Sequence, residues 1–434
     1  MRIAMIGGGY VGLVSGACFA EFGVDVSVVE ADPGKLAVLQ SGRVPIYEPG
    51  LEQLVATNVA AGRLRFFGEL APALEGAEAV FIAVGTPTRR GDGHADLTYV
   101  YAAAEQVARA LTAPAVVVTK STVPVGTGRR LADILRQTRP DLDIEVASNP
   151  EFLREGSAIG DFMRPDRVVI GAESERAQDV LRRLYRPLYL IETPIVFTSL
   201  ETAELIKYAA NSFLAMKVTF INEMADLCEK AGADVHDLAR GIGLDGSIGR
   251  KFLHPGPGFG GSCFPKDTLA LVRIAQDAGA PSRLVEAVVA VNTARKAGMA
   301  TRVAAACGGS VRGRTVALLG LTFKPETDDM RDSPSLPIVS RLTGEGAQVR
   351  AYDPAGMEQA RELLGEGVTY CKDAIDAATG ADALVVVTEW NEFRALAPER
   401  LRTAMRGNVV VDLRNIYDPE AMRAAGFDYR SIGR

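Results

Sequence analysis

The chain has 434 residues, of which 47% are hydrophobic and 24% are charged, and its formal net charge is −6. This composition is typical of a globular protein, and the length predicts two or three domains. Because no block of basic residues interrupts the chain, the composition argues against a surface that binds nucleic acid.

The cysteines also exclude some classes of protein. The five cysteines, at positions 18, 228, 263, 307 and 371, are far apart and form no CxxC motif. Their spacing argues against a disulfide framework and against zinc, and with three scattered histidines we expect no metal site. Glycines interrupt the apolar N-terminus, and no later segment offers about 18 apolar residues in a row. We therefore expect a soluble, cytoplasmic protein without a membrane partner.

The first third of the chain alternates short apolar runs with helical patterns. The predicted strands cover residues 2–6, 24–30, 79–84, 115–121 and 143–148. This alternation predicts a parallel sheet with helices on both faces.

The middle of the chain, from about residue 199 to 306, lacks strand signals. Residues 199–232 are predicted to form one long helix that ends at a glycine. A helix of this length can connect two domains or pair with a copy of itself.

A second series of strands follows, at residues 314–321, 348–354, 381–389 and 408–415. We therefore predict an α/β protein in which two Rossmann-like parallel-sheet domains are joined by a central helical domain with a long connecting helix. The predicted boundaries are 1–198, 199–306 and 307–434.

The first candidate site is a dinucleotide-binding turn. Gly7, Gly9 and Gly12 form GxGxxG directly after a strand and directly before a helix. The first glycine allows a tight turn, the second lets a pyrophosphate approach, and the third packs helix against strand. The next strand ends at Glu30, whose carboxylate can bind a ribose diol and repel a 2′-phosphate, so NAD is favoured over NADP. Lys35 weakens this preference slightly, and Cys18 on the helix is expected to be a packing residue.

The second candidate site is a thiol in the stretch PGPGFGGSCFPKD, residues 255–267. Pro265 suits the first turn of a helix, so Cys263 is predicted just before a helix N-terminus. A helix N-terminus and a nearby lysine, here Lys266, favour the reactive thiolate. Three glycines are expected to let a ligand and backbone amides approach the sulfur: Gly258, Gly260 and Gly261.

The long helix and one loop supply further polar groups. Glu204, Lys207 and Asn211 share one face of the predicted helix. Lys207 is either a snorkelling surface residue or an ammonium that faces a developing alkoxide, with an attraction of about 4 kcal/mol at about 4 Å. A helical turn after Pro150 would place Glu151 and Glu155 on one face, near a strand end where parallel sheets bind ligands.

Together these stretches resemble the UDP-glucose/GDP-mannose dehydrogenase family over nearly the whole chain. The stretches, in family order, are GGGYVGLV, YEPGL, VGTPT, KSTVPVGT, NPEFLREGSA, ELIKYAANSFLA, GFGGSCFPKD and GLTFKPETDDMRDSP. The resemblance implies an NAD-dependent, four-electron oxidation of the C6 alcohol of a nucleotide sugar, with UDP-glucose oxidised to UDP-glucuronate. It also implies a homodimer formed through the long helix.

Three alternatives stay open. The first is the same chemistry on GDP-mannose or on a UDP-N-acetylhexosamine. The second is a non-catalytic sensor of NAD or of a nucleotide sugar, although such a sensor needs no nucleophile. The third is a two-electron hydroxyacid dehydrogenase of similar architecture, which needs no cysteine.

The resemblance also implies roles for individual residues. Cys263 is expected to form a thiohemiacetal and then a thioester, with Lys207 as the oxyanion stabiliser and Asn211 as its polar partner. Asp267 is expected to place a proton or water, and Glu151 and Thr122 to position the hydrolytic water. The expected cofactor contacts are Gly7, Gly9, Tyr10, Val11, Gly12, Glu30, Lys35, Val84, Thr86, Pro87, Ser121, Thr122, Glu155, Lys266 and Arg331. The expected substrate contacts are Glu151, Phe152, Leu153, Lys207, Asn211, Arg250, Phe252, Phe259, Gly260, Phe323, Lys324 and Arg414.

The chain departs from the family pattern at two places. Ser247 stands where the family usually has an arginine that reaches the active site of a neighbouring subunit, which leaves the hexose preference open. Arg250 is the candidate substitute. The second departure is VDLRN where DGRN is common, which keeps Arg414 but changes the backbone flexibility beside it.

Overall fold

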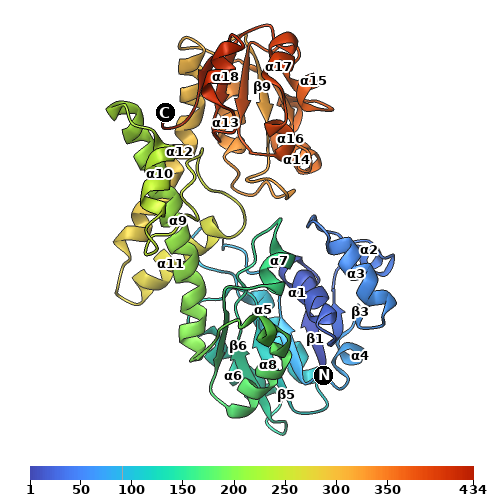
Figure 1. Ribbon diagram of the computed structural model, residues 1–434. Coiled ribbons are helices and arrows are strands. Elements are labelled where there is room, and N and C mark those ends of the chain that lie inside the picture. Colours follow the sequence, from blue (N-terminus) through green and yellow to red (C-terminus); the bar gives the residue numbers. More distant parts are fainter. Residues whose placement is uncertain (90) are drawn as a thin grey trace. The chain divides into compact units, whose positions relative to one another are not determined.

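The computed structural model describes residues 1–89 and 91–434. The chain divides into two compact units (Figure 1), Met1–Ala210 with Arg273–Ala280 and Asn211–Val272 with Pro281–Arg434. The predicted fold class is confirmed, because two mainly parallel sheets precede and follow a helical region that contains one long helix. Within the described residues, no helix is both long and apolar enough to cross a membrane.

The first unit contains an eight-stranded sheet. Its strands are β1 (Arg2–Ile6), β2 (Asp25–Val29), β3 (Leu64–Phe67), β4 (Ala79–Ile82), β5 (Ala115–Thr119), β6 (Ile144–Ser148), β7 (Val168–Ala172) and β8 (Ile195–Thr198). They lie in the order β3-β2-β1-β4-β5-β6-β7-β8. The first six have the strand order of a doubly wound dinucleotide-binding fold. The predicted strands of this sheet are all parallel, as expected, whereas β7, which was not predicted, runs antiparallel to β6.

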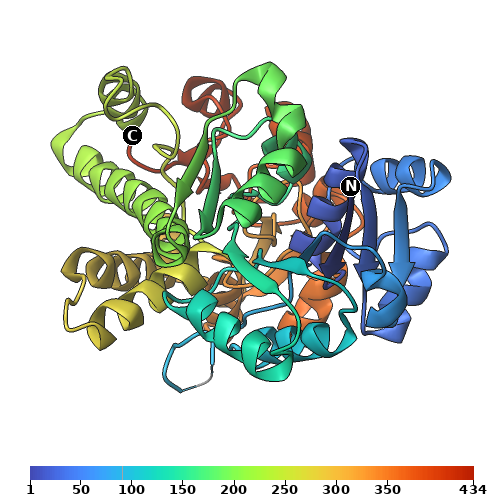
Figure 2. The ribbon, with the colours of Figure 1, turned by 90° about the horizontal axis from the view of Figure 1, so that it is seen from below.

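Helices cover both faces of this sheet (Figure 2). The helices of the unit are α1 (Tyr10–Glu21), α2 (Pro33–Gln40), α3 (Leu51–Ala60), α4 (Leu70–Leu74), α5 (Thr98–Ala110), α6 (Thr127–Thr138), α7 (Ala158–Met163), α8 (Glu175–Leu184) and the 3-10 helix η1 (Arg186–Ile191). Ile3 and Met5 of β1 pack into a core with α1, α3, α7 and α8, whereas Ala4 and Ile6 pack into a core with α4, α5 and α6. Alternate residues of one strand therefore serve two cores.

The second unit contains a six-stranded, fully parallel sheet. Its strands are β9 (Thr315–Leu319), β10 (Gln348–Tyr352), β11 (Val368–Tyr370), β12 (Ala383–Val386), β13 (Val409–Asp412) and β14 (Asp428–Arg430), in the order β11-β10-β9-β12-β13-β14. The helices around it are α13 (Ser335–Gly344), α14 (Met357–Leu364), η2 (Gly365–Gly367), α15 (Ala374–Ala378), α16 (Asn391–Arg394), α17 (Pro398–Ala404) and α18 (Pro419–Ala424). The strand order reverses between β9 and β12, which marks the edge where such sheets bind ligands.

Four helices connect the two series of strands. They are α9 (Leu200–Ala231), α10 (Val235–Gly243), α11 (Phe264–Asp277) and α12 (Arg283–Ala306). The predicted long helix is present as α9, whose 32 residues span about 48 Å. Ile221 and Ala225 of α9 pack with Val303 of α12 and Val316 of β9 in one core of the second unit.

Candidate active site

The turn between β1 and α1 has the geometry that the glycine spacing predicts. Gly7 has a φ of +109°, and a side chain there would meet the Ala83 carbonyl oxygen at 2.7 Å. A side chain on Gly12 would collide with the carbonyl of Gly7. In contrast, apart from Gly9 itself and its chain neighbours, no atom of the described residues lies within 4 Å of the place where a Cβ of Gly9 would stand. The turn is therefore tight on its protein side and open at Gly9, which fits a pyrophosphate at the N-terminus of α1, where Tyr10 and Val11 begin the helix.

Glu30 lies where the sequence predicts an acid, directly after β2. Its carboxylate accepts hydrogen bonds from the amides of Gly8, at 3.1 Å, and Asp32, at 2.8 Å. These bonds fix the carboxylate beside the glycine turn, where it can receive a ribose diol. Lys35 lies on α2, and its amide donates to Asp32. Cys18 is fully buried in the core, and burial raises the pKa of its thiol to about 12.

Glu48 is a buried carboxylate for which no role was predicted from the sequence. It accepts hydrogen bonds from the hydroxyl of Tyr10 and from the amides of Gly156, at 2.6 Å, and Ala158, at 2.8 Å. Glu48 therefore ties the start of α1 to the loop that carries Glu155. Glu48 lies in the stretch YEPGL, but the residues that it contacts are about 40 and 110 residues away in sequence. No local pattern therefore predicts its partners.

The ends of β4 and β5 are joined by side chains from both predicted cofactor segments. The hydroxyl of Thr86 donates to the carbonyl of Thr122, at 3.0 Å, and the hydroxyl of Ser121 donates to the carbonyl of Val84, at 2.6 Å. These residues follow the carboxyl ends of neighbouring parallel strands. They therefore lie at the edge where doubly wound sheets bind ligands, together with Pro87.

Glu151 and Lys207 form a buried ion pair. The Nζ of Lys207 lies 2.8 Å from Oε1 of Glu151, and the two side chains are 3% and 6% exposed. Burial raises the pKa of Glu151, but the charge and hydrogen bond of Lys207, the amide of Leu153 and the charge of Lys120 together hold this pKa below its ordinary value. Lys207 is therefore a buried cation, and the alternative of a snorkelling surface lysine is wrong.

The segment around Glu151 differs from the prediction in one respect. Residues 151–154 are not helical, and α7 begins only at Ala158, so Glu151 and Glu155 do not share a helical face. The amide of Leu153 donates to the carboxylate of Glu151 at 2.5 Å, which closes a short turn instead. The ring of Phe152 stacks against Arg167, with the guanidinium carbon 3.5 Å from the ring centroid.

Glu204 binds the N-terminus of α6. Its carboxylate accepts the amides of Gly126 and Gly128, each at 2.7 Å, at the N-terminus of α6. Burial raises the pKa of Glu204 to about 7, against the lowering effect of these two hydrogen bonds. Glu204 therefore holds α6 and the segment that follows Thr122.

In the second unit, Cys263 directly precedes α11, as predicted. The amide of Asp267 donates to the carbonyl of Cys263 at 2.8 Å, which makes Cys263 the N-cap of the helix. The hydroxyl of Ser262 lies 3.6 Å from the sulfur. Cys263 is partly exposed, whereas the other four cysteines are buried, and none of the five forms a disulfide. The exposed position at a helix N-terminus is typical of reactive cysteines.

Asp267 connects two of the predicted residues. Its Oδ2 accepts a hydrogen bond from Nδ2 of Asn211 at 2.6 Å, and its Oδ1 lies 2.7 Å from Nζ of Lys266. Asp267 is 1% exposed, so both partners are needed to satisfy its charge. The structure thus joins α9 to the first turn of α11 one turn behind the thiol.

The glycine-rich loop before Cys263 is crowded by the chain itself. A side chain on Gly261, whose φ is +83°, would meet the ring of Phe323 at 2.6 Å. A side chain on Gly260 would collide with the carbonyl of Asp332, and one on Gly258 would meet Lys296 at 2.7 Å. The absence of side chains at these three glycines therefore makes room for Phe323, Asp332 and Lys296 of the chain itself. The approach of a ligand to the sulfur of Cys263 stays a prediction.

The predicted substrate contacts of the second unit follow the ends of its strands. Phe323 and Lys324 come after β9, and Arg414 comes after β13. Arg414 donates to the carbonyls of Val387, at 2.8 Å, and Phe323, at 3.0 Å, and pairs with Glu389 at 3.0 Å. The departure VDLRN has a packing reason, because Leu413 is fully buried in the core.

The remaining predicted residues are less closely grouped. Arg331 makes two bonds of 2.9 Å to Asp329. The rings of Phe252 and Phe259 both pack against Phe264. Arg250 is exposed in the same loop as Ser247, whose amide donates to Asp245.

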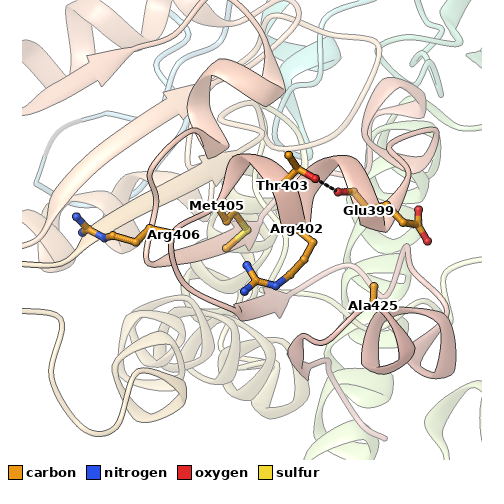
Figure 3. Close-up of a pocket in the computed structure, with 6 residues that line it drawn as sticks. All are labelled: Glu399, Arg402, Thr403, Met405, Arg406 and Ala425. Atoms are coloured by element: carbon orange, nitrogen blue, oxygen red, sulfur yellow. Dashed lines mark hydrogen bonds between the residues drawn. The ribbon is translucent and has the colours of Figure 1, made fainter.

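Two hollows of the second unit lie at opposite ends of its sheet. The larger, about 510 Å³, is lined by Glu399, Arg402, Thr403, Met405, Arg406 and Ala425 (Figure 3). Arg406 and Ala425 precede β13 and β14, so this hollow lies at the amino ends of the strands. The other, about 430 Å³, is lined by His254, Pro255, Glu389, Arg394, Arg414, Asn415 and Ile416. Several of its residues follow β12 and β13, which makes it the better candidate for a ligand.

No group of His, Cys, Asp or Glu side chains within residues 1–89 and 91–434 is arranged to hold a metal ion.

Comparison with known proteins gives the same picture along the whole chain. Residues 1–189 match the NAD binding domain of the UDP-glucose/GDP-mannose dehydrogenase family, residues 201–294 its central domain, and residues 317–419 its UDP binding domain. The chain is 61% identical to UDP-glucose 6-dehydrogenase of Rhizobium meliloti strain 1021, with 100% of both chains covered.

Solved structures extend this likeness to three dimensions. A UDP-glucose dehydrogenase from Pyrobaculum islandicum is similar with a TM-score of 0.91 and 40% identity, over 99% of this chain and 96% of the other. A UDP-D-ManNAc dehydrogenase from Pyrococcus horikoshii is similar with a TM-score of 0.86 and 28% identity, over 100% and 99%. The chain belongs to the UDP-glucose/GDP-mannose dehydrogenase family.

Proposed function

We propose that this protein is a UDP-glucose 6-dehydrogenase that oxidises the C6 alcohol of UDP-glucose to the carboxylate of UDP-glucuronate in two steps. The identity of 61% to an enzyme of that name, against 28% to a UDP-D-ManNAc dehydrogenase, favours UDP-glucose over a UDP-N-acetylhexosamine. The observation that carries the chemistry is Cys263, the one cysteine that is not buried, at the N-terminus of α11.

The proposed reaction needs a hydride acceptor and a nucleophile. NAD, when bound, supplies the hydride acceptor for both oxidations. The first oxidation removes a hydride and a proton from the C6 alcohol and gives an aldehyde. The sulfur of Cys263 then adds to C6, which gives a thiohemiacetal. Loss of a second hydride from C6 and of the proton from its hydroxyl group leaves a thioester. Water then adds to the thioester carbon, and the thiolate of Cys263 leaves as the carboxylate is released.

The other predicted catalytic side chains have proposed roles that follow from their chemistry. The buried ammonium of Lys207 stabilises negative charge on the C6 oxygen, because a preorganised cation is most effective where water is excluded. Glu151, ionised by its partners, and Thr122 position the hydrolytic water. Asn211 and Lys266 hold Asp267, which directs a proton or a water to the sulfur.

The cofactor and the nucleotide have separate proposed sites. Residues 1–198 bind NAD at the turn of Gly7, Gly9 and Gly12, with Glu30 on the ribose. Residues 307–434 bind the UDP moiety through Phe323, Lys324 and Arg414, and residues 199–306 carry the catalytic lysine and cysteine. The absence of GxGxxG after β9, where the chain reads GLTFK, supports this division.

We further propose that two copies of the chain pair through α9. Phe213, Phe220 and Leu227 recur every seven residues and are 59%, 45% and 56% exposed. A stripe with this spacing lies along one side of a helix, and exposed apolar side chains in such a row mark an interface. Sedimentation should therefore give a dimer for the natural chain, and Phe220→Glu should give a monomer. A monomeric natural chain at micromolar concentration would contradict this pairing.

The test of the proposed function is the number of NADH molecules formed per UDP-glucose consumed, with NAD in excess. Two NADH per sugar support the four-electron route, and one NADH points to a two-electron enzyme. No NADH from UDP-glucose, GDP-mannose or UDP-N-acetylhexosamines, with NAD still bound, points to a sensor. Cys263→Ser is the matched control, because it keeps the size of the side chain and should abolish formation of the carboxylate.

A further inference from the structure

Lys120 is a buried lysine that the proposed chemistry does not use. It follows β5 directly and is 3% exposed. Its Nζ donates hydrogen bonds to Oδ1 of Asn149, at 3.0 Å, and to the hydroxyl of Tyr185, at 3.1 Å. The rings of Phe162 and Tyr185 each lie 5.8 Å from the ammonium. In the described part of the chain no carboxylate pairs with it directly, so its burial needs another reason.

The first effect of Lys120 is to fix the side chain of Asn149 by a hydrogen bond. Oδ1 of Asn149 also accepts a hydrogen bond from Tyr185 at 2.5 Å, and Nδ2 donates to the carbonyl of Val169 at 2.8 Å. The backbone amide of Asn149 donates to Thr119 at 2.9 Å. Asn149 is thus fixed at its backbone and at both ends of its side chain. Since Glu151 stands two residues further on, this network fixes the start of the segment that carries Glu151.

The second effect of Lys120 is electrostatic. Its charge and that of Lys207 both act on Glu151, whose own hydrogen bond goes to Lys207. With all three groups ionised, the buried cluster of Lys120, Glu151 and Lys207 has two positive charges and one negative charge. A cluster with an excess positive charge stabilises an anion beside it, and an oxyanion intermediate is such an anion.

We propose that Lys120 is a positioning residue of the reaction, which acts through Asn149 and Glu151: it holds the Glu151 segment and supplies the second positive charge that keeps Glu151 ionised. This proposal rests on the proposed function for its effect on turnover, but its effect on Glu151 does not depend on the substrate. Lys120 needs no contact with substrate or cofactor for this role.

The charge state of Lys120 sets the sign of the pH effect. Burial lowers the pKa of Lys120 to about 7, Glu151 raises it and Lys207 lowers it further. The groups that face it are Asn149, Tyr185, Phe162, Glu151 and Lys207. Below about pH 7 Lys120 is charged and stabilises the carboxylate of Glu151. Its removal should therefore raise the pKa of Glu151 and move the acid limb of the kcat profile to higher pH.

The test compares Lys120→Met with Tyr185→Phe. Both variants remove hydrogen bonds from the Asn149 network, but only the first removes the charge. We expect Lys120→Met to lower kcat by about 10- to 100-fold with little change in KM for UDP-glucose, because misplacement of a catalytic group has effects of this size. Its acid limb should shift upward by about half a pH unit or more, whereas Tyr185→Phe should leave the limb in place. An unchanged kcat and acid limb in Lys120→Met would overturn the proposal, and so would an equal shift in both variants.

A second measurement separates this proposal from the proposed function. The carboxylate of Glu151 is titrated by infrared spectroscopy in protein labelled with 13C-glutamate, and its band is identified by its loss in Glu151→Gln. We expect Glu151 to titrate at higher pH in Lys120→Met than in the natural chain, whether or not UDP-glucose is turned over. Identical titrations would overturn the proposal even if the enzyme forms two NADH per sugar. Where Lys120→Met does not fold, Lys120→Gln, which keeps a donor for Asn149, takes its place with the same two criteria.

Discussion

Replacing Lys207 by methionine leaves the carboxylate of Glu151 buried without its direct partner. The two charged atoms are 2.8 Å apart, which at an effective dielectric of about 20 corresponds to an attraction of about 6 kcal/mol. Part of this is offset by the cost of burying both charges, and removal of one partner from a buried pair costs about 3 to 5 kcal/mol. We expect Lys207→Met near the lower end of that range, because the amide of Leu153 and the charge of Lys120 still stabilise Glu151.

Glu151→Gln should be the more costly of the two changes at low pH. It leaves the ammonium groups of Lys120 and Lys207 buried together without a negative charge between them. Above pH 7 Lys120 can lose its proton, so the cost should fall as the pH rises. The double variant removes both members of the pair and should lose about 2 to 3 kcal/mol less than the sum of the single changes.

Hydrogen exchange measured by mass spectrometry suits this test because it reports each sheet separately. Peptides from β5 and β6 report the first unit, and peptides from β9 and β12 serve as the internal control. The fluorescence of Trp390, the one tryptophan, reports only the second unit. If the opening free energies of β5 and β6 in both single variants stay within about 1 kcal/mol of those in the natural chain, the ion pair does not stabilise the first unit. Additive single changes would refute the coupling.

Other parts of the chain give three further predictions. Since burial raises the pKa of Glu204 to about 7 from 4.5, its contribution to stability is full below pH 4.5 and is lost as the pH rises through 7. The free energy of unfolding of the natural chain, relative to Glu204→Gln, should therefore fall by about 3 kcal/mol across that window in denaturant titrations. Gly261→Ala should destabilise the second unit by about 2 kcal/mol more than Gly308→Ala, because both glycines have φ near +80° but only Gly261 faces a ring; equal losses by Trp390 fluorescence would contradict the packing. Iodoacetamide should label Cys263 alone among the five cysteines in the native protein, and peptide mapping that finds Cys18 or Cys228 labelled as fast would contradict the burial described.

The strands that the sequence predicted are those with long apolar runs. Nine of the strands are readable from the sequence, because central parallel strands are buried on both faces and are therefore apolar throughout. The short edge strands β3, β8, β11 and β14 were not predicted. LRFF, VTY and DYR carry polar residues on an exposed side, and IVFT of β8 has only four residues, none of them buried. The run VVIGA of β7 was not predicted, although all five of its residues are buried, and its antiparallel direction leaves no signal in the sequence.

The candidate site was predictable in its parts but not in its contacts. Cys263 was placed correctly because a proline in the first turn marks a helix start locally. The bond from Asn211 to Asp267 and the pair of Lys207 with Glu151 each join residues 56 apart in sequence. No local pattern determines which of several carboxylates such a group reaches. For the same reason the sequence could not show that Phe323 fills the space beside Gly261.

The buried cluster of Lys120, Glu151 and Lys207 poses a final question, because apolar residues of similar size would stabilise the unit at least as well. If the charges are retained for chemistry, a triple variant, Lys120→Met with Glu151→Gln and Lys207→Met, should be more stable than either Lys207→Met or Glu151→Gln. No lone charge remains in it, and the side-chain oxygen of the new glutamine can still accept the amide of Leu153. Its stability should vary less with pH than that of the natural chain around pH 7, because Lys120 no longer titrates. Turnover should be lost entirely.

Hydrogen exchange in β5 and β6 measures the stability of the triple variant, and NADH formation measures its turnover. A triple variant less stable than both single variants would mean that the three charges hold the fold together, and their presence in the cluster would then need no catalytic explanation.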